Sequence, residues 1–537
     1  MSQKRKNIIF ISLAAILAFF VFVFIYGETL DPRYDAWLLT AGPDPVQQYL
    51  GWIMYRQADW TMPIAIAKNY PYPFGTSITF TDSIPLLAIL FKAIRSALPV
   101  NFQYFGLWIA SCFVMQGVFG YLLSYLFFKK RLAALLASLF FVFSPAMLFR
   151  LGGHFALGAH WLILASYLVI FYKHHRLSYL KWSGILSLSL LIHPYLFFIN
   201  SFLMLVDVLT LYFLDKKINF KEILYFLIFQ ALLVVLIAYL LGLFLIGAAN
   251  APGYGDFSMN LNAIFNPMGW SNILPDLDII RYQAEGFNYL GFGTLSLLVA
   301  SLIKFFIKVN IKDFVYKKWP IILVFFILLV IAISNVVAFG SNILFIWPLN
   351  TFIKDNIFGL FRSSGRFFWP IFYILVLGSF YVLKNLKYKF VLLILTLALA
   401  LQIYDLSGIL YQRGQTFERR GFSYDILTPQ FREASQAYQH LAFFPVIPHK
   451  NYMVFVVFAS KNNLTVNNGQ FARPIAGQSE YLDEEMSQIK NGQLDRDTIY
   501  VFSRDADSFI ENLDITKHLY MAIDNTFVLF PYFRQDE

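Results

Sequence analysis

The sequence predicts an α-helical polytopic membrane protein with about eleven transmembrane helices and a small α/β domain at its C-terminal end. Of its 537 residues, 58% are hydrophobic and 14% are charged, and 60 are Phe and 32 are Tyr. A soluble domain of this length could not bury so much apolar side chain. Apolar runs long enough to cross a bilayer recur up to about Asp405, after which the sequence becomes polar and no spanning run follows.

The first apolar run, residues 8–26, follows the basic segment 4–6 and is long enough to span. No small-residue cleavage site follows before Glu28, so we expect an uncleaved first helix with its basic end in the cytoplasm. The predicted spans are residues 8–26, 102–128, 132–149, 155–172, 182–194, 195–214, 223–246, 288–307, 320–339, 368–385 and 390–406.

The basic residues between these runs predict the orientation of the bundle. If the spans alternate from a cytoplasmic N-terminus, every cluster of Lys and Arg falls on the inside, as the positive-inside rule requires. The clusters lie at 129–131, 173–181, 216–221, 304–318 and 384–389. The net charge of +10 is therefore a topology signal and does not indicate nucleic-acid binding. The chain is expected to be a multi-pass membrane protein with its N-terminus in the cytoplasm and its C-terminal domain outside the cytoplasm.

We expect a transmembrane domain over residues 1–406 and an extracytoplasmic soluble domain over 407–537. The transmembrane domain includes a large first external loop, 27–101, in which 84–97 resembles an interfacial or re-entrant helix. The alternation of Val and aromatic residues in the soluble domain predicts an α/β module. Its expected strands are 452–459, 498–502 and 526–532, and its expected helices are 429–441 and 505–513.

The first external loop contains the most informative carboxylate, Asp44. Followed by Pro45, it is typical of a helix N-cap with proline at the first helical position. The predicted orientation puts this helix just outside the membrane. Asp44 could be a structural cap, a binding residue or a catalytic base, since a carboxylate is ionised at neutral pH and can take a proton from a nucleophile.

A second cluster, Arg362 and Arg366, comes directly before the tenth predicted span on its outer side. Two arginines are unusual there under the positive-inside rule, and their four-residue spacing can put both on one helical face. Guanidinium groups bind phosphate through two parallel hydrogen bonds, so we expect a lipid phosphate or pyrophosphate, or else ordinary headgroup contact. Glu285, at another outer entrance, could pair with these arginines or contact a sugar.

Other polar residues lie near the predicted outer surface. Asp82 could be a helix cap or a functional residue. His154, His160 and His193 lie close to the membrane interface, where a polar group faces the protein interior or a water-filled cavity. Each histidine could be functional, or could be a packing residue that forms hydrogen bonds.

We predict no protein-bound metal site, although Asp31 and Asp35 could join Asp44 around a divalent cation such as Mg²⁺ or Mn²⁺. Acids with this spacing more often cap turns. The only cysteine, Cys112, falls inside an apolar run, which excludes an intrachain disulfide and a cysteine metal site. The sequence contains no zinc motif, Walker loop, dinucleotide fingerprint or nucleophile elbow.

Taken together, several of these segments resemble the GT-C superfamily of membrane glycosyltransferases, and in particular an uncharacterised bacterial family of multi-spanning proteins related to it. In that superfamily an Asp, usually followed by Glu, precedes a Tyr and an Asp-Trp-x-x-Pro-like segment. Here Pro45 replaces the second acid, and Tyr49 stands one place late. The segments that carry the resemblance are 44–63, 80–85, 152–154, 193–194, 285–291 and 362–366.

This resemblance implies a GT-C-like fold and a glycosyltransferase that uses a polyprenyl-phosphate-linked sugar. The acceptor would be an envelope glycan, a lipid or a protein outside the cytoplasm, with no role for nucleic acid. Asp44 would then act as the general base, and Tyr49, Asp82, His154, His193, Glu285, Arg362 and Arg366 would bind substrate.

Two other classes of function stay open. A transporter or flippase for a lipid-linked saccharide would tend to keep polar residues in mid-membrane and internal repeats, neither of which is clear in this sequence. A noncatalytic assembly factor would use the outer domain to recruit a partner.

Overall fold

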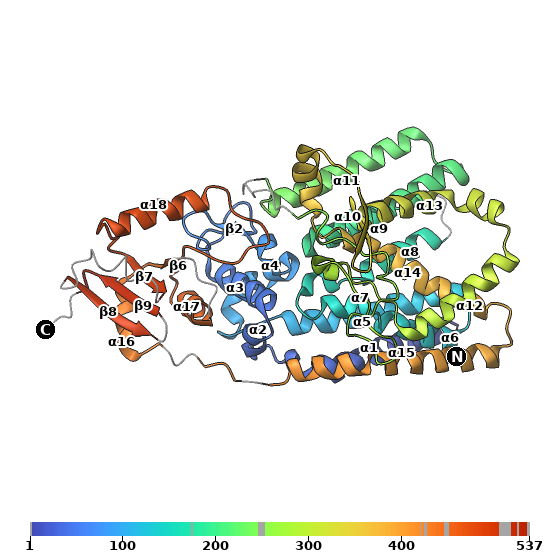
Figure 1. Cartoon of the computed structure of the whole chain (residues 1–537), viewed down its shortest axis with the longest axis horizontal. Coiled ribbons are helices and arrows are strands. Elements are labelled where there is room, and N and C mark those ends of the chain that lie inside the picture. The colour runs from blue at the N-terminus through green and yellow to red at the C-terminus, as the bar shows by residue number, and fades with distance from the viewer. Residues whose placement is uncertain are drawn as a thin grey trace. The chain divides into compact units, whose positions relative to one another are not determined.

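The computed structural model describes residues 3–172, 176–244, 253–419, 421–423, 427–444, 450–503, 517–523 and 526–533 (Figure 1). The chain divides into two compact units. Unit 1 comprises Met1–Pro32, Tyr104–Ile237 and Asn250–Glu418, and unit 2 comprises Arg33–Gln103, Ala238–Ala249 and Arg419–Glu537.

Where unit 1 is described, its regular structure is helical apart from one antiparallel hairpin, β3 (Val336–Phe339) and β4 (Asn342–Ile346). Its helices are α1 (Gln3–Tyr26), α5 (Phe105–Phe128), α6 (Arg131–Val142), α7 (Pro145–Arg150), α8 (Trp161–Phe171), α9 (Tyr179–Ile192), α10 (Pro194–Leu209), α11 (Phe220–Leu240, whose end belongs to unit 2), α12 (Phe292–Lys308), α13 (Ile311–Ile333), α14 (Trp369–Ser379) and α15 (Tyr388–Thr416).

Eight helical segments among the described residues are long and apolar enough to cross a membrane, which fits a polytopic membrane protein. They are Arg5–Leu30, Phe105–Phe128, Arg131–Arg150, Pro194–Leu214, Phe220–Leu240, Ile311–Ile333, Ser364–Leu383 and Tyr388–Thr416. The expected count of about eleven is not confirmed. The other three predicted spans correspond to shorter helical segments, Phe155–Phe171, Tyr179–Ile192 and the 17-residue α12. The second of these stops at His193, where Pro194 begins the next helix.

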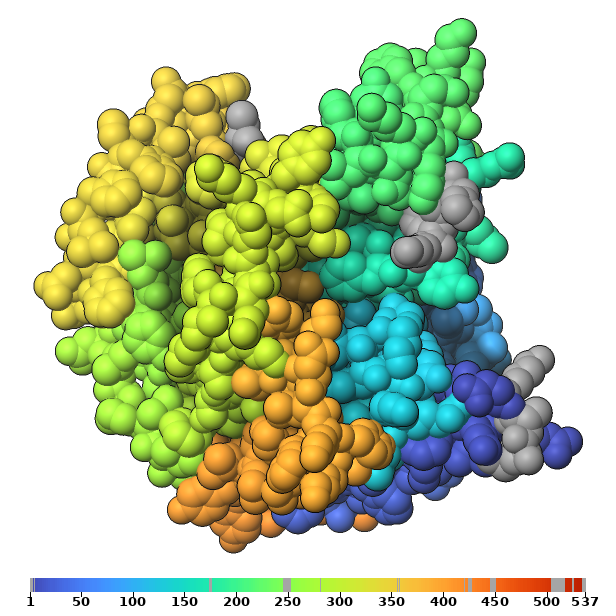
Figure 2. Space-filling view, turned by 90° about the vertical axis from the view of Figure 1, so that its right-hand side faces the viewer, coloured from blue at the N-terminus to red at the C-terminus, as the bar shows by residue number. Residues whose placement is uncertain are grey.

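Apolar surface remains exposed on several of these helices. In the spanning windows of α11 and α13, 22% and 17% of the residues are buried, so most of their apolar side chains need lipid or another apolar cover. Figure 2 shows one end of unit 1, where α1, α6, α12 and α15 form part of the surface and the green α11 projects at the upper right. The contacts of α15 with α1, α6 and α12 hold this end together.

Unit 2 combines the segment after α1 with the C-terminal part of the chain. Its helices are α2 (Ala36–Thr40), α3 (Pro43–Gln57), α4 (Pro85–Ala93), α16 (Pro429–Ala434), α17 (Lys450–Lys461) and α18 (Gln478–Lys490). Its strands are β1 (Ile66–Ala67), β2 (Thr76–Ser77), β5 (His440–Phe444), β6 (Thr465–Val466), β7 (Thr498–Ser503), β8 (His518–Ile523) and β9 (Thr526–Pro531). Helix α17 contacts α3, and the Tyr70 and Tyr452 hydroxyls lie 3.0 Å apart.

A five-stranded sheet of order β6-β5-β7-β9-β8 organises the C-terminal part. Strand β5 is parallel to β6 and β7, whereas β9 is antiparallel to β7 and β8. Alternate residues of β5 face opposite layers, as the pleat requires. Phe444 packs with Leu482 of α18, and Phe443 packs on Phe455 of α17. The result is a sheet with helices on both faces, which confirms a small α/β region.

The individual elements of this region agree only in part with the predictions. The strands expected at 498–502 and 526–532 are β7 and β9. The strand expected at 452–459 is wrong, because these residues lie in α17, where burial against the sheet overrides the β propensity of Val and Phe. The helix expected at 429–441 ends early and gives way to β5. The helix expected at 505–513 lies outside the described residues.

Candidate functional site

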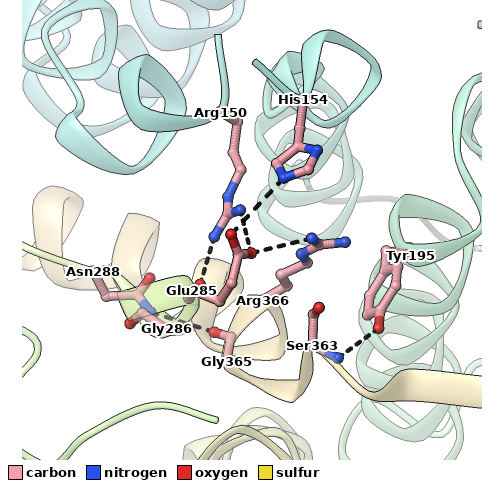
Figure 3. Close-up of polar contacts among 9 residues, drawn as sticks. All are labelled: Arg150, His154, Tyr195, Glu285, Gly286, Asn288, Ser363, Gly365 and Arg366. Atoms are coloured by element: carbon pink, nitrogen blue, oxygen red, sulfur yellow. Dashed lines mark hydrogen bonds and ion pairs between the residues drawn. The ribbon is translucent and has the colours of Figure 1, made fainter. Parts of the chain in front are cut away.

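Glu285 is the centre of a charged cluster in unit 1 (Figure 3). Its Oε2 accepts hydrogen bonds from Arg150 Nη1 at 2.7 Å and from Arg366 Nη2 at 3.2 Å. Arg150 also donates through Nη2 to the Glu285 carbonyl at 2.5 Å, and His154 Nε2 lies 3.8 Å from Oε1. The two guanidinium side chains are 1% and 9% exposed and the carboxylate side chain 27%, so the cluster is reached from solvent through Glu285.

The cluster assembles because two loops approach closely through glycine. Glu285 lies in the 3-10 helix Arg281–Gly286, and Arg366 in the 3-10 helix Ser364–Phe368. A Cβ on Gly365 would lie 2.6 Å from the Gly286 Cα, so no side chain fits there. Asn288 Nδ2 donates to the carbonyls of Gly286 at 2.9 Å and Gly365 at 3.3 Å, which joins the two loops (Figure 3).

Electrostatics keeps the Glu285 carboxylate ionised. Burial raises the pKa of Glu285, but the guanidinium groups of Arg150 and Arg366 and the nearby His154 outweigh it and hold the pKa well below its usual range. One carboxylate therefore faces two guanidinium cations. Within the described residues the guanidinium group of Arg366 donates one hydrogen bond, to Glu285, and its buried Nε has no partner. The cluster thus keeps positive charge and unused donors.

Aromatic rings support both arginines. The guanidinium carbon of Arg150 lies 4.8 Å from the Phe149 ring centroid and 5.7 Å from that of Trp369. Arg366 lies 4.7 Å from the Tyr195 ring. The Tyr195 hydroxyl in turn accepts the backbone N–H of Ser363 at 2.9 Å, which fixes the segment that carries Arg366.

Arg362 lies outside this ion-pair network. It is half-buried, with its guanidinium carbon 5.8 Å from the Phe257 ring centroid, and it has no ion pair in the described part of the chain. The expectation that Arg362 and Arg366 share one helical face is wrong, because Arg362 precedes the 3-10 helix that contains Arg366. The pairing of Glu285 with Arg366, one of the two roles open for this acid, is present.

His193 has a structural role at the start of α10. Its Nδ1 accepts the backbone N–H of Tyr195 at 3.1 Å, so it caps the helix whose first turn presents the Tyr195 ring to Arg366. His160 is fully buried, with Nδ1 at 2.7 Å from the Tyr373 hydroxyl and its ring 4.2 Å from that of Trp369, which also contacts Arg150. Among the three histidines, His154 is the one beside the Glu285 carboxylate.

Asp44 lies in unit 2, in the first turn of α3. The predicted N-cap is displaced by two residues, because the helix begins at Pro43 and Gly42, with φ 129°, is the capping residue. A positive φ of this size suits glycine. A cavity of about 300 Å³ adjoins this turn, lined in part by Pro43, Gln47 and Tyr452. The Asp44 side chain is half-buried and is not part of the lining.

The remaining candidates between α1 and α5 are accounted for by local structure. The Tyr49 hydroxyl donates to Asp35 Oδ2 at 2.7 Å, and Tyr49 is 1% exposed. Asp82 is not an N-cap. It follows the 3-10 helix Ile78–Thr81 as its C-cap, with φ 55°. Among the described residues no group of three or more His, Cys, Asp or Glu could hold a metal ion, so Asp31, Asp35 and Asp44 do not converge on one.

Arg150 is the cluster residue that sequence reasoning missed. It follows an apolar run directly, where an arginine resembles an ordinary flank of a membrane helix. Its partner Glu285 is 135 residues away, and nothing local in the sequence marks that pairing. The available signal was its position at the predicted outer end of a span, the same feature that singled out Arg362 and Arg366.

Comparison with known proteins places the chain in a family. Residues 14–407 match the domain of unknown function DUF6311, and residues 430–531 match the DUF6311 C-terminal domain. The chain belongs to the DUF6311 family. No curated protein matches. Arg150, Glu285 and Arg366 all lie within the first DUF6311 match, whereas the five-stranded sheet of unit 2 lies within the second. No match to a GT-C family was found, so that resemblance stays a prediction.

Proposed function

We propose that this protein is a membrane glycosyltransferase that takes a sugar from a polyprenyl-phosphate carrier and transfers it to an acceptor on the extracytoplasmic side of a bacterial plasma membrane. The observation that carries the proposal is the Arg150–Glu285–Arg366 cluster in the helical unit. The proposal adopts the orientation derived from the basic clusters between the spans, with the N-terminus in the cytoplasm.

The charge of the cluster favours an anionic ligand. Arg150 and Arg366 carry two positive charges and Glu285 carries one negative charge, which leaves a net charge of about +1. Arg362, four residues before Arg366 in the chain, adds a further positive charge to this segment. A lipid phosphate would take hydrogen bonds from Arg362 and from the guanidinium group of Arg366, which donates one hydrogen bond among the described residues. Arg150, held by two bonds to Glu285, would act through its charge and by keeping that carboxylate in place.

Asp44 is the proposed base. In the reaction the acceptor oxygen bonds to the anomeric carbon, the bond from that carbon to the phosphate oxygen breaks, and polyprenyl phosphate leaves with the electron pair. Asp44 takes the proton of the acceptor hydroxyl, and the anomeric configuration inverts. Glu285 is a poor candidate for this role, because its pKa is held well below its usual range and it therefore binds a proton weakly.

The test is a transfer assay with purified full-length protein in liposomes. The donor is a polyprenyl phosphate that carries a radiolabelled hexose, and the products are free polyprenyl phosphate and labelled glycoside. The Asp44→Asn variant should lose at least 100-fold in rate, within the range attributed to general base catalysis. The matched control is Asp313→Asn, which removes an exposed carboxylate paired with Lys317 and should leave transfer unchanged.

Other outcomes of this assay would reject the proposal. Full transfer by Asp44→Asn would exclude this residue as the base. Movement of intact donor across the bilayer without release of polyprenyl phosphate would identify a transporter. If neither transfer nor movement occurred with any polyprenyl-phosphate hexose or pentose, a noncatalytic assembly role would replace the enzyme.

A further inference from the structure

A second polar cavity lies in unit 2 at the other end of α3. Its volume is about 760 Å³, within the range of about 300–1,000 Å³ for small-molecule sites. It is bounded by the C-terminal end of α3 with the residues that follow, by the segment 68–72, by the turn after α4 and by residues 463–465. Gln57 lies thirteen positions after Asp44, so this cavity is about 20 Å along the helix from the proposed base.

Two arginines make the floor of this cavity rigid. Arg56 donates four hydrogen bonds of 2.7 to 3.1 Å to the carbonyls of Arg95, Leu98, Pro99 and Val100. Arg95 donates back to three carbonyls at the end of α3, those of Arg56, Gln57 and Ala58. Each guanidinium thus fixes the backbone segment that carries the other, and the walls are set before any ligand arrives.

The cavity is positively charged. All the hydrogen-bond acceptors of Arg56 and Arg95 are neutral carbonyls, and in the described residues neither arginine has a carboxylate partner. With exposed Lys68, three cations face one lining acid, Asp59, for a net charge of about +2. Partial negative charge on the carbonyls at the end of α3 offsets part of this excess.

Behind the cavity, Lys92 adds a buried cation. It is 1% exposed, donates to the Asp59 carbonyl at 3.2 Å and lies 3.9 Å from the Tyr55 ring centroid. Burial and the charge of Arg95 lower the pKa of Lys92 to about 8. A further positive charge in this region is therefore already unfavourable, and an anion bound in the cavity would relieve it.

One wall carries an exposed aromatic ring. Tyr72 is 38% exposed and stacks on His440, with ring centroids 4.4 Å apart and an interplanar angle of 17°. His440 Nδ1 lies 2.7 Å from Thr465 Oγ1, which anchors the stacked pair. The other lining side chains include neutral amides and hydroxyls, namely Gln57, Thr61, Asn69, Ser96, Asn463 and Thr465.

We propose that this cavity binds an acidic saccharide, a glycan that carries carboxylate or phosphate groups. Amides and hydroxyls match the paired donors and acceptors of sugar hydroxyls, the Tyr72 ring offers an apolar surface to a sugar ring, and the excess cations select an acidic residue. The site does not require the transfer reaction, because it is distinct from both Asp44 and the Glu285 cluster. Its role would be to hold a growing or finished envelope glycan on unit 2.

Titration calorimetry on the full-length protein in detergent tests this proposal. It compares the binding of acidic tetragalacturonic acid with that of neutral maltotetraose. The acidic tetrasaccharide should bind at least tenfold more tightly. Lys68→Gln and Tyr72→Ala should each weaken its binding at least tenfold, while Tyr72→Phe, which keeps the ring, should retain it. Lys490→Gln, which removes an exposed lysine of the same unit away from the cavity, is the matched control.

Three results would overturn the assignment. They are equal binding of the two tetrasaccharides, an unchanged affinity in Lys68→Gln, and competition by soluble anionic phospholipid, which would make the cavity a headgroup site. Only variants whose melting temperature equals that of the wild-type protein enter the comparison, so that a loss of binding is not caused by misfolding. The Asp44→Asn variant separates this proposal from the transfer reaction, because it should bind the acidic glycan normally even where transfer is lost.

Discussion

Replacing Glu285 with glutamine should destabilise unit 1, because it leaves two buried guanidinium groups without their counter-ion. The carboxylate accepts charge-assisted hydrogen bonds from Arg150 at 2.7 Å and Arg366 at 3.2 Å. Hydrogen bonds to charged groups contribute about 1.5–3 kcal/mol each, and loss of one partner of a buried ion pair costs about 3–5 kcal/mol. Because Glu285 is 27% exposed, water screens part of this loss. We expect a decrease of about 3 kcal/mol in the free energy of unfolding.

The assay is equilibrium unfolding in mixed detergent and SDS micelles, arranged as a double-mutant cycle with Arg366→Met. Removing one arginine relieves the repulsion that Glu285→Gln exposes, so the double variant should be more stable than the sum of the single changes predicts, by about 1–2 kcal/mol. A control cycle on the exposed pair Asp313 and Lys317 should give a coupling of under about 0.5 kcal/mol. A coupling energy of under about 0.5 kcal/mol between Glu285 and Arg366 would refute the ion-pair reasoning.

Three further outcomes follow from the same cluster. The folded-state pKa of Glu285 lies below its unfolded value. Its stabilising contribution is therefore complete above about pH 4.5 and is lost as the pH falls through the folded pKa. The acid-induced loss of stability should accordingly be smaller in Glu285→Gln than in the wild type. Gly365→Ala should push the loop away from Gly286 and cost about 1–3 kcal/mol in unfolding free energy, together with most of the transfer rate. Arg362→Gln should change stability by less than about 0.5 kcal/mol but raise the KM for the polyprenyl-phosphate donor about tenfold, and an unchanged KM in the transfer assay would exclude it as a phosphate ligand.

The sequence was sufficient for the class of fold but not for its details. Apolar runs reveal membrane helices because the bilayer sets a minimum length, whereas the end of each helix depends on local breaks such as His193-Pro194. Residues 452–459 show a case in which the local pattern predicts the wrong type of element. Their Val and Phe content is typical of a strand, yet packing between the sheet and α3 makes them helical. Tertiary burial, which no local pattern records, decided that element.

The sequence likewise indicated some residues of the candidate site but not how they contact one another. Arg366 and Glu285 stood out because charge is unusual at the predicted outer ends of apolar runs. Their joint contact with Arg150 could not be predicted, since it depends on the backbone crossing at Gly286 and Gly365. His193 shows that a polar residue near the membrane can be accounted for by helix capping.

Accessibility of cysteines from outside the cell tests most directly whether Asp44 and the arginine cluster can act on one lipid-borne substrate. Cys112 is fully buried, so Asp44→Cys and Arg362→Cys can be labelled in intact cells with a membrane-impermeant maleimide. Asp313→Cys, at a predicted cytoplasmic loop, is the protected control. Labelling of positions 44 and 362 but not 313 is the expected result. Labelling of only one of the first two would put base and phosphate ligand on opposite sides of the bilayer and contradict the proposed reaction.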